Sequence, residues 1–135
     1  MIDLGGCPAS QNCSRTPAIT LTLSQPQPQT TVCTVTGTVD WNTHPMLRQA
    51  LTEAAHSRVL YLVIDLSAVA AMDAAGPYTL LEARAQHRRR GSGHLAVIID
   101  PTCCAIPDLH QVAIRAAFDI YPTVTDALHA CDPTR

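Results

Sequence analysis

The chain has 135 residues, which is enough for one domain with a hydrophobic core and too few for two. It is 47% hydrophobic but only 4% aromatic, so its core must consist mainly of Ala, Val, Leu and Ile, and this favours compact α/β packing. The formal net charge of -2 argues against nucleic acid as a partner, because phosphate neutralisation needs clustered Lys and Arg. The basic run at 88–90 is interpreted as the solvated C-terminus of a helix.

The sequence shows neither a membrane span nor a secretion signal. No window approaches the roughly 18 apolar residues that a membrane-spanning helix requires, and no basic start precedes an apolar core. We therefore expect a cytoplasmic protein that has no membrane partner. Residues 1–18 are rich in Gly, Ser, Pro and Cys and are predicted to form a flexible extension, followed by one domain at 19–131 and a C-terminal tail at 132–135.

In the first half of the domain, apolar and polar residues first alternate as in β-strands, and apolar residues then recur at helical spacing. Residues 19–23 predict an edge strand, 24–29 a loop and 31–39 a second strand, with Cys33 and the valines on one face and the threonines on the other. Turn and capping residues at 40–43 precede a helix over 44–56.

The central stretch is an unbroken apolar run over 59–66, typical of a strand buried on both faces. Asp65 at its end is expected to accept hydrogen bonds from backbone N–H groups of the following loop. A turn at 73–76 then leads into a helix at 77–90, in which Leu80, Leu81 and Ala85 are predicted to face inward. Such a strand–turn–helix junction presents free N–H groups and a positive helix dipole, which suit a phosphate or an acidic partner.

The remaining elements continue the alternation of strands and helices. Residues 94–99 predict a strand and 118–121 a short extended piece, and Thr123 with Asp126 predicts a capping box before a fourth helix that ends near Cys131. Apolar residues at helical spacing outline a third helix: Ile106, Leu109, Val112, Ala113 and Ala116. This order predicts an α/β sheet with right-handed crossovers.

Residues that could carry catalysis or bind a metal are not grouped in the sequence. The six cysteines, at 7, 13, 33, 103, 104 and 131, lack paired C-x-x-C spacing, and Cys33 and Cys131 are interpreted as core residues. The adjacent pair Cys103 and Cys104 leaves a redox role open. The six histidines show no metal-binding spacing and no glycine-rich phosphate loop occurs, so we expect no enzyme, no metal and no cofactor.

Three segments together resemble the STAS domain of anti-sigma factor antagonists. They are Val35-Thr36-Gly37-Thr38-Val39-Asp40, then Val63 to Ser67 with Met72-Asp73-Ala74-Ala75-Gly76, and Phe118 to Thr123 leading into Asp126-Ala127-Leu128. The resemblance implies a single STAS domain, with a mixed β-sheet of four to five strands and about four α-helices packed on it. It also implies a kinase-like anti-sigma factor as partner, whose sequestered sigma factor is released for transcription.

One position departs from the phosphorylated members of that family. Their turn reads Asp-Ser-Ser-Gly and its second Ser receives phosphate, whereas this chain has Ala75 there and therefore no acceptor hydroxyl. The resemblance places partner contacts at Asp40 and at Asp73, Ala74, Ala75, Gly76, Pro77 and Tyr78. A constitutive antagonist is expected, the alternative being a ligand- or redox-responsive sensor. Whether the chain forms a homodimer stays open.

Overall fold

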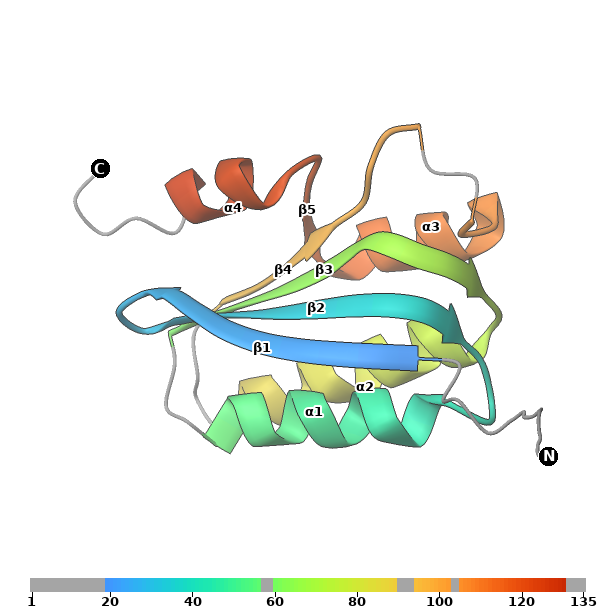
Figure 1. Cartoon of the computed structure of the whole chain (residues 1–135), viewed down its shortest axis with the longest axis horizontal. Helices are drawn as coiled ribbons and strands as arrows, with labels where there is room; N and C mark the ends of the chain where they lie inside the picture. Colours follow the sequence, from blue (N-terminus) through green and yellow to red (C-terminus); the bar gives the residue numbers. More distant parts are fainter. Residues whose placement is uncertain (1–18, 57–59, 90–93, 103–104, 131–135) are drawn as a thin grey trace, which may run out of the picture.

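One mixed β-sheet forms the centre of the computed structural model, which describes residues 19–56, 60–89, 94–102 and 105–130. Its five strands lie in the order β1-β2-β3-β4-β5, with β1 antiparallel to β2 and every other pair parallel (Figure 1). The elements are β1 (Ile19–Gln27), β2 (Thr30–Val39), α1 (His44–His56), β3 (Tyr61–Met72), α2 (Ala75–Arg89), β4 (His94–Ile98), α3 (Asp108–Ala117), β5 (Asp119–Tyr121) and α4 (Val124–Ala130). The predicted fold class is confirmed.

Helices cover both faces of this sheet. The larger core joins α1, α2 and α3 to one face through Leu47, Leu80 and Ile114, which are all fully buried. The smaller core packs α4, through Ala127, on the other face (Figure 1). Among the described helices, none is both long and apolar enough to cross a membrane.

Cys33 lies in the larger core and is fully buried, as predicted. Burial and the negative charge of Asp65 raise the pKa of its thiol to about 11, so this thiol stays protonated and unreactive. The other predictions that concern cysteines, at Cys103, Cys104 and Cys131, fall outside the described residues, as do the extension at 1–18 and the tail at 132–135.

The strands β1 and β3 extend further than the sequence predicts. β1 continues through Pro26, which is tolerated because β1 is an edge strand and its pairing with β2 is interrupted between Ser24 and Gln27. β3 continues to Met72, although 67–72 is rich in Ala, because these residues pair with Thr36–Val39 of β2. Backbone pairing has overridden low β-propensity here. Gly37, with a φ of 101°, lies where that pairing shifts register and where a side chain would be strained.

The buried faces of α2 and α3 differ from the predicted ones. In α2 the buried residues include Leu80, whereas Leu81 is 41% exposed and Ala85 is also exposed. The inward face passes through Thr79, Leu80 and His87 instead. Leu81 and Ala85 are rotated by about 100° and 140° from Leu80 around the helix axis, whereas His87 lies about two turns from Leu80 and shares its face.

In α3 the predicted stripe is out of phase with the helix. Leu109 and Val112 are 75% and 64% exposed, and Ile114 is the buried residue. The predicted stripe takes its phase from Ile106, but Ile106 lies before Pro107 and outside the helix, which begins at Asp108.

Two adjacent leucines of α2 provide a matched test of this packing. We expect Leu80→Ala to lower the free energy of unfolding by about 2–5 kcal/mol, because it leaves a cavity in the core. Leu81→Ala should cost less than about 1 kcal/mol, because its side chain is largely solvated. Urea unfolding followed by circular dichroism measures both. Equal losses for the two variants would show that the register of α2 is wrong.

Candidate functional site

The loops that follow β2 and β3 meet at one edge of the sheet. The strands are parallel, so their carboxyl ends lie together, and the N–H of Asp73 donates to the carbonyl of Val39 at 3.0 Å. The β2–α1 loop and the β3–α2 turn therefore form one surface, at the right-hand side of Figure 1. We call this surface the corner and define it as Asp40 to His44 together with Asp73 to Tyr78.

Hydrogen bonds of the Asp40 side chain and backbone hold the β2–α1 loop in place. Its Oδ1 accepts hydrogen bonds from the N–H groups of Asn42 and Thr43, both at 2.9 Å. Its N–H in turn donates to Thr43 Oγ1 at 2.9 Å, and that hydroxyl donates to the carbonyl of Thr38 at 2.8 Å. These reciprocal bonds resemble a capping box and set the start of α1.

Asp73 caps the start of α2. Its Oδ1 accepts from the N–H of Ala75 at 2.8 Å, and its carbonyl accepts from the N–H of Gly76 at 3.0 Å. The N–H of Tyr78 donates to the carbonyl of Ala74 at 3.3 Å, and Pro77 has no N–H. The expectation of free N–H groups awaiting an anion is thus wrong, because the chain satisfies these donors itself.

The predicted site residues differ in exposure. Ala75 is fully buried and Gly76 and Pro77 are buried as well, whereas Ala74 and Tyr78 are exposed and Asp40 and Asp73 are partly exposed. A Cβ on Gly76 would collide with Cγ and Sδ of Met72, so a bulky residue there would disturb packing before it touched a partner. A partner can therefore reach Ala74, Tyr78 and the two carboxylates directly.

Sequence reasoning missed an aromatic cluster in the corner. The ring centroid of Trp41 lies 5.3 Å from the ring centroid of His44 and 5.8 Å from that of Tyr78. The ring centroids of His44 and Tyr78 are 6.4 Å apart. Trp41 is 56% and Tyr78 is 52% exposed. The signal was present in the sequence, because the single Trp of the chain stands beside Asp40, but turn chemistry explained that segment without it.

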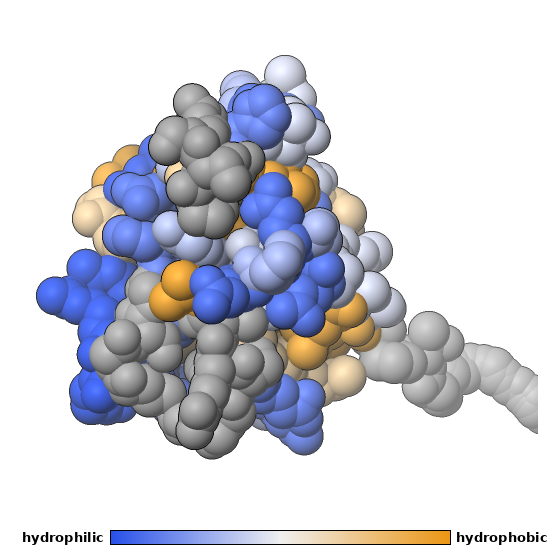
Figure 2. All heavy atoms as spheres, turned by 90° about the vertical axis from the view of Figure 1, so that its left-hand side faces the viewer, coloured by the Kyte–Doolittle hydropathy of each residue, from blue (hydrophilic) through white to orange (hydrophobic). Residues whose placement is uncertain are grey.

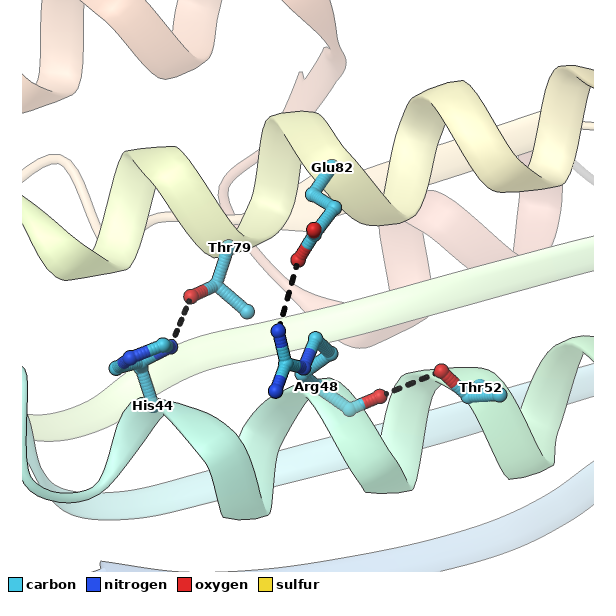
Figure 3. Close-up of polar contacts among 5 residues, drawn as sticks. All are labelled: His44, Arg48, Thr52, Thr79 and Glu82. Atoms are coloured by element: carbon cyan, nitrogen blue, oxygen red, sulfur yellow. Dashed lines mark hydrogen bonds and ion pairs between the residues drawn. The ribbon is translucent and has the colours of Figure 1, made fainter.

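Polar contacts join α1 to α2 at His44 and further along the two helices (Figure 3). The Thr79 hydroxyl lies 3.3 Å from His44 Nδ1, and Arg48 forms an ion pair with Glu82 at 3.7 Å. The Thr79 side chain in this contact is fully buried. Beyond these contacts the helices border an open polar groove of about 1000 Å³, lined by residues that include Gln49, Gln86 and Arg89.

Asp65 has a structural role away from the corner. Its Oδ1 accepts from the N–H of Ser67 at 2.9 Å and from the Ser67 hydroxyl at 2.6 Å. This is the predicted local bonding, although β3 continues past it and no loop begins there.

The end of the molecule opposite the corner is different in character. Figure 2 views the end where the β1–β2 hairpin lies, and its coloured surface is mostly hydrophilic with small separate apolar spots.

Within the part of the chain that the structure describes, no group of His, Cys, Asp or Glu has the arrangement of a metal site.

Comparison with known proteins identifies the kind of domain. A family model described as "Mlab, STAS domain" matches residues 23–119. The crystal structure of an anti-sigma factor antagonist from Mycobacterium paratuberculosis is 29% identical, with a TM-score of 0.66 over 83% of this chain and 92% of that one. No curated protein matches the chain.

Two structures of SpoIIAA, a Bacillus anti-sigma factor antagonist, share the fold. The unphosphorylated form is 15% identical, with a TM-score of 0.62 over 83% of this chain and 96% of that one. The phosphorylated form is 14% identical, with a TM-score of 0.60 over 84% and 100%.

The capping role of Asp73 is separable from its charge. Asp73→Ala should lower the free energy of unfolding by about 0.5–2 kcal/mol, because the N–H of Ala75 loses its acceptor. Asp73→Asn should remain near wild type, since an amide oxygen caps a helix equally well. Thermal and urea unfolding of the two variants measure the difference. A loss as large for Asn as for Ala would mean that the negative charge, and not the hydrogen bond, stabilises the turn.

Proposed function

Because the chain belongs to the STAS domain family, we propose that it is an anti-sigma factor antagonist, which binds a kinase-like anti-sigma factor and so releases a sigma factor. The likeness to the Mycobacterium paratuberculosis antagonist, at 29% identity over most of both chains, carries this proposal. In this role the protein acts by binding and not by catalysis. Its proposed partner regulates transcription, which places the action in the bacterial cytoplasm.

The accessible part of the corner supports the proposal. Ala74 and Tyr78 are exposed beside the partly exposed Asp40 and Asp73, so the surface that the family resemblance assigns to a partner is open to one. Asp73 holds the turn beneath this surface: it accepts hydrogen bonds from the N–H groups of Ala75 and Gly76, and its own N–H donates to the carbonyl of Val39. A preformed surface loses little conformational entropy when it binds.

Ala75 makes the proposed antagonist independent of phosphorylation. A methyl group accepts no phosphoryl group, so the added negative charge of about -1.5 to -2 that phosphate brings cannot arise at this position. The ligand- or redox-sensor alternative is not favoured, because the similar solved structures named above are anti-sigma factor antagonists.

The decisive experiment is a binding assay of the full chain against the kinase-like anti-sigma factors encoded in its source genome. We expect one of them to bind with the same Kd in ADP and in ATP, because no phosphate can be transferred to position 75. An antagonist whose turn reads Asp-Ser-Ser-Gly serves as the control and should dissociate from its own kinase in ATP. Dissociation of this chain in ATP, with phosphate found on it by mass spectrometry, would contradict the constitutive role. Binding to none of these factors would overturn the proposed function.

Burial adds a second barrier to phosphorylation at this turn. Ala75 is fully buried and its N–H is bonded to Asp73, so a hydroxyl placed there would be shielded from a kinase. We therefore expect Ala75→Ser to incorporate little phosphate and to keep its complex in ATP. Phosphate transfer from labelled ATP measures this, with the Asp-Ser-Ser-Gly antagonist as the positive control. Transfer to the variant at the control's rate would show that the missing hydroxyl alone disables the switch.

A further inference from the structure

The three rings of the corner come from separate elements yet form one cluster. Trp41 lies in the β2–α1 loop, His44 is the first residue of α1 and Tyr78 lies in the first turn of α2. Centroid separations of 5.3–6.4 Å are those of interacting aromatic rings. The contact between His44 Nδ1 and the buried Thr79 hydroxyl ties the cluster to α2 (Figure 3). The rings are thus positioned before any partner arrives.

The fold itself does not require Trp41 and Tyr78. Both side chains are more than half exposed, and neither belongs to the two cores. Trp and Tyr are the residues, together with Arg, that most often dominate the energetics of protein interfaces. Two such rings side by side on the surface, in a chain with only 4% aromatic residues, therefore indicate a contact with another molecule.

The charges around the cluster indicate what that molecule presents. Asp40 and Asp73 flank the rings, and each gives its Oδ1 to backbone N–H groups. Among the described residues, no arginine forms an ion pair with either carboxylate, and Arg48 is paired with Glu82 instead. The arginines of α2, which are Arg84, Arg88 and Arg89, lie in its later turns. The corner is accordingly aromatic and negatively charged.

We propose that Trp41, His44 and Tyr78 form the energetic centre of the interface with the anti-sigma factor, and that this cluster receives a basic side chain of that partner. A guanidinium or ammonium group is attracted to aromatic faces and to neighbouring carboxylates at once, and a planar guanidinium also stacks on rings. An acidic partner is disfavoured, since the helix N–H groups that would hold it are occupied within the chain. The inference rests on the proposed function and adds to it two residues, Trp41 and His44, and the chemistry of the contact.

Alanine substitutions in the full chain test the aromatic part. Using the anti-sigma factor identified by the binding assay, we expect Trp41→Ala and Tyr78→Ala each to raise Kd by about 30-fold, the size typical of a hot spot. Trp41→Phe, which keeps a ring, should recover much of the affinity. Leu109→Ala and Val112→Ala are controls, because they remove even more exposed apolar side chains from α3, and they should leave Kd within about twofold. Circular dichroism melting of every variant checks that the fold is retained.

Charge-neutral variants test the basic side chain. Asp73→Asn keeps the capping oxygen and removes only the charge, so we expect a Kd about 5–10 times higher and a weaker dependence of Kd on salt concentration. Asp40→Asn should likewise raise Kd and weaken its dependence on salt concentration. Because Trp41 is the single tryptophan, its emission, with Trp41→Phe as the blank, reports directly on contact at the corner. We expect the emission to change when the complex forms.

The outcomes separate this inference from the function on which it rests. If no anti-sigma factor binds the wild-type chain, the proposed function fails. If one binds with unchanged Kd for Trp41→Ala and Tyr78→Ala, the function stands and the aromatic centre is wrong. If the alanine variants weaken binding but added salt and Asp73→Asn do not, the cluster does not receive a basic side chain, and that part of the proposal is wrong. A loss of self-association on Trp41→Ala, seen by analytical ultracentrifugation, would assign the surface to a second copy of the chain and overturn the inference.

Discussion

The parallel pairing of β2 with β3 is the constraint on which the corner depends. Register pairs run from Thr30 with Tyr61 to Val39 with Met72, and the N–H of Asp73 extends the ladder by one more bond to the carbonyl of Val39. Without that extension the β3–α2 turn would end several residues from the β2–α1 loop. The Ala-rich end of β3 therefore matters less for its side chains than for its backbone, which carries Asp73 to the level of Asp40.

The corner combines a buried turn with an exposed rim, and the two have different tasks. Ala75, Gly76 and Pro77 pack inward, with Gly76 so close to Met72 that no Cβ fits without a shift of that side chain. The rim presents Ala74 and Tyr78 beside Trp41. A phosphoryl group in the buried turn would disturb the packing beneath the rim and would add negative charge beside it. In the proposed antagonist the apolar Ala75 leaves that packing undisturbed.

Much of this fold could be predicted from the sequence, because local signals and tertiary packing agree over most of it. The helix over 44–56 was predicted with its observed bounds, since Asp40 to Pro45 carries strong capping and N-terminal chemistry. Where non-local pairing decided the structure, the prediction was wrong. The sequence predicts that β3 ends at Leu66, because only the pairing with β2 makes 67–72 a strand. In α3, Ile106 set the phase although it lies outside the helix.

The candidate site was predicted only in part for a related reason. The family resemblance assigns Asp40 and Asp73 to the site, and the structure brings them to one corner; their role in binding a partner stays a prediction. Trp41 and His44 lie close together in the sequence, but Tyr78 is far from both and meets them only when α1 and α2 lie side by side, so the three rings were not grouped. Spacing within one element carries no information on such a contact.

Under the proposed function, the lack of a phosphorylatable side chain at Ala75 has a consequence for regulation. Competition for the anti-sigma factor then follows mass action alone, so the fraction of antagonist-bound factor depends on the ratio of free antagonist to Kd. A tenfold shift in that ratio corresponds to about 1.4 kcal/mol, which a cell can reach by changing the amount of protein. Control of such an antagonist consequently falls on its synthesis and degradation. The stability of its fold, which the core around Leu80 and the caps at Asp40 and Asp73 provide, thereby becomes part of its regulation, since unfolded chains are those that proteases remove.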